Sequence, residues 1–245
     1  MPQRGAKRVK ILGGVIVSRG CRKDNRSFHP IFTLPITREM AANNSASRTA
    51  FNELMRRSVT PVLKPLGFKK SSANYHRRLG DVVQVVNLQV SHGSTALSLS
   101  FYINVGLAFD AVCKLTDNTV SEKPKEYECD ARGMRARLET LVADVPDVWT
   151  CEPGNVDEVA PQLSVAIEAL SRDLNAIDSV AAYREHRWFD QMRSLNAQIF
   201  YLLGDFDSAW QTLVTFSQQF ETDRPLSKPG WWVEQLGLTK LADRS

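Results

Sequence analysis

Four polar side chains alternate with apolar residues along two neighbouring stretches of the chain, 81–91 and 95–105. They are Asn87, Gln89, Tyr102 and Asn104. Amides and a phenol both donate and accept hydrogen bonds, so this set suits recognition of a peptide or of a polar ligand. The alternative is a solvated sheet face, or a face capped by a helix, because antiparallel sheets commonly have one such face.

A second candidate is cationic. Arg132, Arg135 and Arg137 lie close together, and guanidinium groups match the geometry of phosphate oxyanions. Acidic neighbours such as Glu126 and Glu139 could pair with them instead, because surface charge runs usually stay solvated or loosely paired. Arg137 joins the four polar residues as a candidate binding residue, and anion binding by the whole segment is the secondary hypothesis.

Metal and nucleophile chemistry have weaker support. His186 and Asp190 are one helical turn apart and could offer two ligands, but a metal site needs three or more protein ligands. Cys129 lies near Arg132, and a nearby cation lowers a thiol pKa, although a buried, inert cysteine is the simpler interpretation. The chain contains no P-loop, GxGxxG, HExxH or GxSxG motif. No cofactor, metal or catalytic residue is therefore assigned.

A sheet would bring the polar residues together. Residues 95–105 alternate strictly, with Leu97, Leu99, Phe101, Ile103 and Val105 on the apolar side. Residues 81–91 form a second predicted strand, and a third at 74–79 joins it through Gly80-Asp81. The pattern predicts a three-stranded antiparallel meander with one buried and one wetter face.

Helices should cover the apolar face of this sheet. Residues 47–66 carry an apolar stripe that includes Phe51 and Leu63, with Pro61 expected to kink or restart the helix and Gly67 to end it. Asn155 should cap a helix that runs to about Asn175. Residues 106–128 are polar and are predicted to be a long loop.

The sequence predicts a helical hairpin near the C-terminal end of the chain. Two apolar stripes, at 188–203 and 206–220, flank Gly204-Asp205 and predict antiparallel helices. Trp231 and Trp232 are expected to anchor the tail on this hairpin, and the alternative is an interface role. The predicted fold class is therefore α+β: an antiparallel β-meander packed against helices, followed by a C-terminal helical hairpin.

Composition limits the class of protein. Of the 245 residues, 43% are hydrophobic and 24% are charged, which is ordinary for a soluble globular protein. No apolar run approaches the ~20 residues of a membrane span, so no membrane partner is expected. Four cysteines without CxxC spacing argue against a zinc site and a disulfide scaffold. Reduced thiols in a cytoplasm are the expectation.

Positive charge is concentrated at the start of the chain. Residues 1–39 hold nine Lys/Arg and two Asp/Glu, whereas the rest hold 22 and 25. The body thus lacks the electrostatic footprint of a nucleic-acid binder. Residues 1–39 are predicted to be a disordered basic leader, with Met40 as a possible natural start. Residues 40–180 should form the α+β domain, and 181–245 the helical hairpin docked on it.

Several segments together resemble a known family. They are FNELMRRSVTPVLKPLGFKKSSANYHRR, DVVQVVNLQVS, YECDARGMRARLETL and the DVW before a helix. Over roughly residues 47–180 they are similar to the bacterial domain-of-unknown-function family 4304. The resemblance implies an α+β domain with an antiparallel sheet and no established activity, substrate or cofactor. It also implies that Gln89 matches the family's most distinctive polar position.

Two functional hypotheses follow. The first is a cytoplasmic bacterial protein that binds another protein without chemistry, in the manner of an immunity or regulatory protein. The second is a small enzyme or ligand-binding protein that uses the polar groups Asn87, Gln89, Tyr102, Asn104 and Arg137. The sequence leaves open whether the protein is an enzyme.

Overall fold

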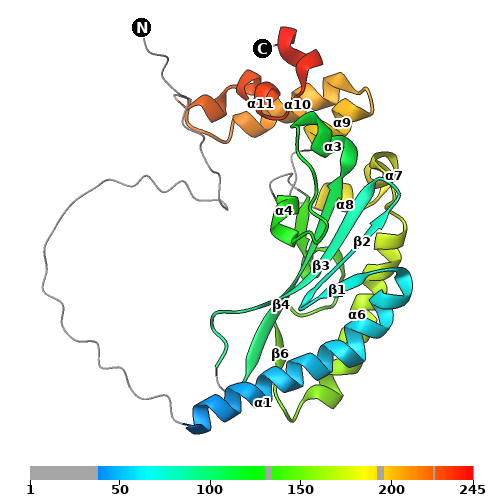
Figure 1. Ribbon diagram of the computed structural model, residues 1–245. Coiled ribbons are helices and arrows are strands. Elements are labelled where there is room, and N and C mark those ends of the chain that lie inside the picture. The colour runs from blue at the N-terminus through cyan, green and yellow to red at the C-terminus, as the bar shows by residue number, and fades with distance from the viewer. Residues whose placement is uncertain (1–37, 96, 131–133, 192–195, 223, 245) are drawn as a thin grey trace, which may run out of the picture. The chain divides into compact units, whose positions relative to one another are not determined.

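Six antiparallel strands form one sheet in the part of the chain that the structure describes. The computed structural model describes residues 38–95, 97–130, 134–191, 196–222 and 224–244, and side chains from residue 46 onward. The strands are β1 (Lys69–Ser71), β2 (Asn74–Leu79), β3 (Val82–Val90), β4 (Leu99–Phe109), β5 (Arg135–Arg137) and β6 (Trp149–Cys151). Their order is β1-β2-β3-β4-β5, and β6 also pairs with β4 (Figure 1). The predicted antiparallel meander is confirmed and extended by three short strands.

Strand β4 is the longest strand and has two partners on one side. Its first half pairs with β6, where Phe101 lies opposite Trp149, and its second half pairs with β5, where Asn104 lies opposite Arg137. Along its other side it pairs with β3 from Val82 to Val90. Segments far apart in the sequence therefore meet on this strand.

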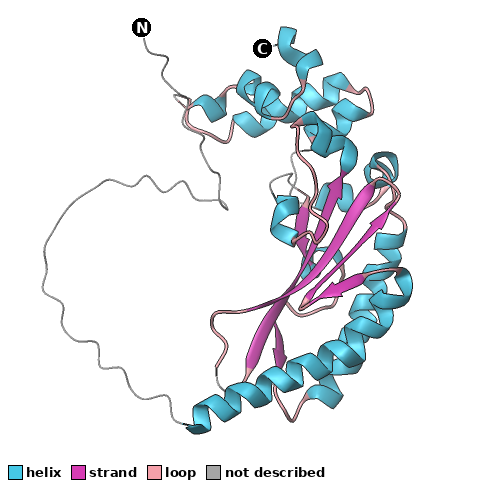
Figure 2. Cartoon of the chain, in the orientation of Figure 1, coloured by secondary structure: helices cyan, strands magenta, loops and turns pink. Residues whose placement is uncertain are grey.

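Helices account for most of the remaining described residues, and Figure 2 shows their distribution around the sheet. They are α1 (Arg38–Leu54), α2 (Thr60–Leu63), α3 (Asp110–Leu115), α4 (Glu126–Asp130), α5 (Leu138–Leu141), α6 (Val156–Asn175), α7 (Val180–Glu185), α8 (Trp188–Gln191), α9 (Ala197–Leu202), α10 (Phe206–Ser217) and α11 (Pro229–Gln235). The fold class α+β, with helices at the C-terminal end, is confirmed.

The first helix begins earlier than its apolar stripe. It starts at Arg38, because Ala, Glu and Met extend a helix without needing a buried face. A π-helical turn, Met55–Val59, separates α1 from α2, and the Thr60 N–H bonds to the Met55 carbonyl. This is the interruption expected from Pro61, which has no N–H to donate. Of the predicted leader 1–39, only Arg38 and Glu39 belong to the described residues.

One face of the sheet packs against α1 and α6. The rings of Phe51 and Phe101 meet edge to face with centroids 5.1 Å apart, and Trp149 stacks on Phe101 at 6.4 Å. Leu163 and Ile167 of α6 belong to the same buried cluster. The predicted packing of the first helix on the apolar face is confirmed.

Two polar residues on this same face tie α6 to the sheet. Buried Arg77 donates hydrogen bonds to Gln84 (2.8 Å), to the Leu66 carbonyl (2.8 Å) and to Asn175 (2.7 Å). Gln84 in turn donates to the carbonyls of Leu174 and Ile177. Carbonyls at a helix C-terminus lack intrahelical partners, and Gln84 supplies a side-chain donor to Leu174 in the last turn of α6 and to Ile177 just after it.

Four expectations need correction. Residues 106–128 are not a loop throughout: β4 continues to Phe109, and α3 and part of α4 follow. Leu97 lies before β4 begins and is 67% exposed rather than buried. Asn155 precedes α6 but does not cap it, because its side chain accepts from the Glu152 N–H at 2.8 Å instead. The predicted helix over 188–203 is represented by α8 and α9, and residues 192–195 lie outside the described part.

The C-terminal hairpin is formed by α9 and α10. Gly204 adopts a left-handed φ of 80° between them, and the Asp205 side chain accepts from the Ser208 N–H. Trp232 then packs on Phe216 with centroids 5.0 Å apart and donates its ring N–H to the Leu226 carbonyl. The predicted anchoring of the tail on the hairpin is confirmed for Trp232.

Candidate functional site

The five predicted binding residues lie on the same face of the sheet, opposite the core. Asn74, Asn87, Asn104 and Arg137 are paired one after another across β2, β3, β4 and β5. One step along, Gln89 lies opposite Tyr102. We call this face the polar face. The alternation in the sequence therefore brings Asn87, Gln89, Tyr102 and Asn104 together, and the register adds Arg137.

Hydrogen bonds between amides hold this row of side chains in place. Asn104 Nδ2 donates to Gln89 Oε1 at 2.8 Å. Asn87 Nδ2 lies 3.5 Å from Asn74 Oδ1, and Asn74 Nδ2 donates to the Pro124 carbonyl at 2.8 Å. The amide of Gln89 is fixed through its oxygen, so its NH₂ group is the part left for a partner.

Arg137 lies on the ring of Tyr102. Its guanidinium carbon is 3.9 Å from the ring centroid, within the range of a cation–π contact. Arg137 is exposed and Tyr102 is half-buried. Among the described residues, no carboxylate lies within ion-pair distance of Arg137. The charge is therefore held in place by an aromatic ring and not neutralised by an acid.

Asn104 carries a buried acceptor without a partner. The residue is fully buried, and its Oδ1 atom has no hydrogen-bond partner among the described residues. A buried polar atom without a partner costs free energy, typically about 1–3 kcal/mol. The protein tolerates this cost at the centre of the candidate site.

Helix α4 covers the other half of the same face. Gly106 makes this possible, because a Cβ there would lie 2.8 Å from Cys129 Sγ and 2.9 Å from Cys129 Cβ. Cys129 joins Val83, Val85 and Ala108 in a small buried cluster. The polar face is thus half covered by α4 and half available around Gln89, Tyr102 and Arg137.

The side of the polar face near β1 is positively charged. Lys69 of β1 lies opposite His76 of β2, and Lys123 directly precedes Pro124, which binds Asn74. Burial lowers the pKa of His76, and the charges of Lys69 and Lys123 lower it further. Asn74, Lys69 and Lys123 were not predicted as site residues, since only the strand register and the Asn74–Pro124 bond reveal their position.

The structure describes two of the three arginines of the candidate anion-binding segment. Arg135 lies 3.8 Å from the buried carboxylate of Glu126, which is the local pairing that the sequence offered as the alternative. Arg137 has no such pairing, and Arg132 lies outside the described residues. Only Arg137 remains as a candidate from this segment.

The candidate metal and thiol sites find no support in the described residues. His186 bonds to Asp173 at 3.3 Å rather than to Asp190, and no group of three or more possible metal ligands occurs there. Cys129 is buried, and Cys113 and Cys151 are also buried and outside any disulfide. Burial and the charge of Glu152 raise the pKa of Cys151 to about 11, which keeps it protonated and unreactive.

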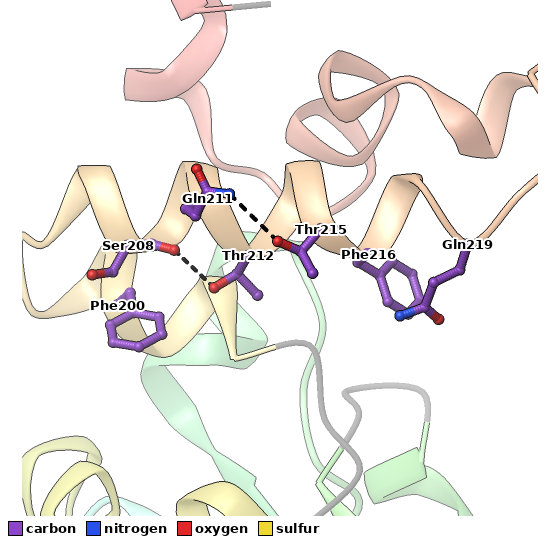
Figure 3. A pocket seen from close by; sticks show the side chains of 7 residues that line it. All are labelled: Phe200, Ser208, Gln211, Thr212, Thr215, Phe216 and Gln219. Atoms are coloured by element: carbon purple, nitrogen blue, oxygen red, sulfur yellow. Dashed lines mark hydrogen bonds between the residues drawn. The ribbon is translucent and has the colours of Figure 1, made fainter.

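A groove of about 450 Å³ lies away from the polar face, along α10. Its lining is neutral: Phe200, Ser208, Gln211, Thr212, Thr215, Phe216 and Gln219. Figure 3 shows Thr212 bonded to the Ser208 carbonyl and Gln211 reaching toward Thr215, so these polar groups are partly engaged within the helix. None of these side chains titrates near neutral pH.

Comparison with known proteins identifies the family. A model of the domain of unknown function DUF4304 matches residues 59–191, more than half of the chain. The chain belongs to the DUF4304 family. The matched region of this DUF4304 protein contains β1 to β6 and therefore the whole polar face.

Other comparisons give no relative. No curated protein matches the chain, and no solved structure matches it. In the described part of the chain, no helix has both the length and the apolar character needed to cross a membrane. The function must therefore be argued from the site itself.

Proposed function

We propose that this DUF4304 protein is a non-catalytic module that binds another protein through the uncovered half of the polar face. The contact surface would comprise Asn87, Gln89, Tyr102 and Arg137, with Asn104 behind them. The observation that supports this proposal is the guanidinium of Arg137, held 3.9 Å above the Tyr102 ring without an acidic partner in the described residues. Arginine and tyrosine are among the residue types that contribute most to protein interfaces.

The arrangement also lowers the cost of binding. Ordering a long side chain at an interface costs roughly 0.5–1.5 kcal/mol. Gln89 is already held by Asn104, and Arg137 is already held by Tyr102. Less conformational entropy is lost when a partner docks on side chains that are fixed beforehand. A cytoplasmic location remains a prediction from the cysteine usage.

Catalysis has less support from the same structure. An active site usually combines a concave pocket with a titratable group of perturbed pKa. The groove along α10 has no such group in its lining, and His76, whose pKa is lowered, is buried on the β1 side of the polar face and outside that groove. The binding function is therefore the better account of the polar face.

Site-specific crosslinking tests the proposal. A photoreactive p-benzoyl-phenylalanine at Thr150, an exposed position of β6 on the polar face, should capture one protein when the full chain is illuminated in its native host. The same residue at Val165, which is 65% exposed on α6, is the matched control. Arg137→Ala should abolish the capture from position 150. Equal capture from both positions, or no capture from position 150, would overturn the proposal.

A further inference from the structure

Three cations around the polar face have no carboxylate within ion-pair distance in the described residues. They are Lys69, Lys123 and Arg137, and all three are exposed. Other arginines do find acids: Arg78 pairs with Asp110, and Arg135 lies near Glu126. The polar face therefore keeps positive charge that the fold does not neutralise.

Lys123 and Arg137 lie at the two ends of the asparagine row, and Lys69 lies on β1, one register step away from the row. Lys69 lies opposite His76 on β2, and Lys123 lies beside the Asn74 end through Pro124. Arg137 lies opposite Asn104 on β5. From β2 to β5 the row crosses three strand spacings of about 4.8 Å each, or about 14 Å in all.

Hydrogen-bond donors lie between these charged ends. Because Gln89 Oε1 is engaged by Asn104, Gln89 presents its NH₂ group to a partner. Arg137 offers further guanidinium donors. A surface rich in donors and cations is complementary to carboxylates, which only accept.

The contact between Arg137 and Tyr102 distinguishes two kinds of anionic partner. Proteins that bind single-stranded nucleic acid stack bases on exposed aromatic rings. Here the guanidinium of Arg137 occupies one face of the only aromatic ring among the five candidate residues. A carboxylate needs no aromatic ring face and can bind the guanidinium where it lies.

We propose that the partner docks an acidic segment across the polar face, with carboxylates at Lys69 and Lys123 at one end and at Arg137 at the other. This inference rests on the proposed function and specifies the chemistry of the partner. An extended segment of about five residues spans the 14 Å from β2 to β5 at roughly 3.3 Å per residue, and about two more residues reach Lys69 on β1, one strand spacing further. Backbone carbonyls of that segment would accept from Gln89 and Asn87.

A titration with defined probes tests this inference without knowledge of the partner. The full chain is titrated with deca-glutamate, with a neutral Gly-Ser decamer and with deca-uridylate. NMR follows the side-chain amides of Asn87 and Gln89, so binding to the basic residues 1–39 does not contribute to the signal. Deca-glutamate should shift both amides at low salt, and raising the salt should reverse the shift.

Charge-neutralised variants make the test specific. The triple variant K69Q/K123Q/R137Q should weaken deca-glutamate binding about tenfold or more, which corresponds to about 1.4 kcal/mol. The control triple K64Q/K114Q/K228Q removes the same charge at exposed sites away from the polar face and should leave the affinity unchanged. Unshifted amides, an equal loss in both triples, or tighter binding of deca-uridylate would overturn the inference.

The crosslinking experiment and the deca-glutamate titration distinguish failure of the proposed function from failure of this inference. If position 150 captures a protein but deca-glutamate does not bind the polar face, the protein-binding function stands and the acidic partner is wrong. If deca-glutamate binds but position 150 captures nothing, the polar face recognises carboxylates and the protein-binding function is wrong.

Discussion

Arg77 and Gln84 lie side by side on neighbouring strands, and the Nε atom of Arg77 donates to Gln84 Oε1 at 2.8 Å inside the core face of the sheet. The pair bonds to the Leu174 carbonyl in the last turn of α6 on one side and, on the other, to the Leu66 carbonyl at the end of the 3-10 turn Lys64–Leu66 that follows α2. Burial lowers the pKa of Arg77, although not enough to discharge an arginine.

Gln84→Met should therefore destabilise the fold strongly. The substitution keeps the volume but leaves Arg77 Nε and the Ile177 carbonyl without these partners and removes one of the bonds to the Leu174 carbonyl, at an expected cost of about 2–4 kcal/mol in the free energy of unfolding. Urea denaturation followed by circular dichroism measures the change. Arg78→Gln, which removes only an exposed ion pair, is the control and should cost less than about 1 kcal/mol. Equal effects of the two substitutions would contradict this account.

Asn104→Leu should behave in the opposite way. It removes a buried oxygen without a partner and fits a side chain of similar shape, so stability should be unchanged or rise by about 1 kcal/mol. Gln89 loses its anchor, and ¹⁵N relaxation should show a more mobile side-chain amide. Capture from position 150 should fall with it. A loss of stability above about 1 kcal/mol would show that Asn104 is mainly structural.

Gly106→Ala should displace α4. The new Cβ would lie under 3 Å from both outer atoms of Cys129, so the expected cost is about 1–3 kcal/mol. Cys129→Ala in the same background removes the closer of these contacts and should recover part of the loss. A double-mutant cycle in urea measures the coupling between the two positions. Additive effects would mean that the helix is not held against Gly106 as described.

His76 should make the fold sensitive to acid. Its pKa is lowered in the folded state, mainly by burial, so the unfolded chain binds a proton more readily. Stability is complete above the ordinary histidine pKa of about 6.5 and declines as the pH falls toward the lower folded value. The urea midpoint should drop between about pH 7.5 and pH 5.5, and His76→Gln should flatten this slope. Exposed His92→Gln is the control, and an unchanged slope in His76→Gln would disprove the assignment.

Alternation predicts the central sheet because polar residues alternate with buried apolar ones at the end of β3 and the start of β4, where Gln89 is exposed and Tyr102 is half-buried. The predicted bounds of strand β2, 74–79, agree with the structure, and Gly80-Asp81 marks the turn that ends the strand. The same pattern places Gln89 and Tyr102 on one face. These features are local, and a local rule is sufficient to find them.

The features that the sequence does not predict depend on contacts that are not evident from local sequence patterns. Gly106 resembles a strand breaker in the sequence, but the structure uses its missing side chain to admit α4. Strands β5 and β6 have three residues each, too few for a period to emerge. Arg137 meets Asn104 only because β5 returns to β4, and Asn155 turns back to Glu152 instead of capping its helix.

The pairing of β4 with two later strands, β5 and β6, has a consequence for folding during synthesis. The meander β2-β3-β4 can form once Phe109 has been synthesised. The other side of β4 has no strand partner until residues 135–137 and 149–151 have left the ribosome. Until then a strand with seven buried apolar residues presents unpaired backbone groups, which are a template for aggregation. We therefore expect the nascent chain to be prone to aggregation after Phe109 has been synthesised and before Cys151 has been added.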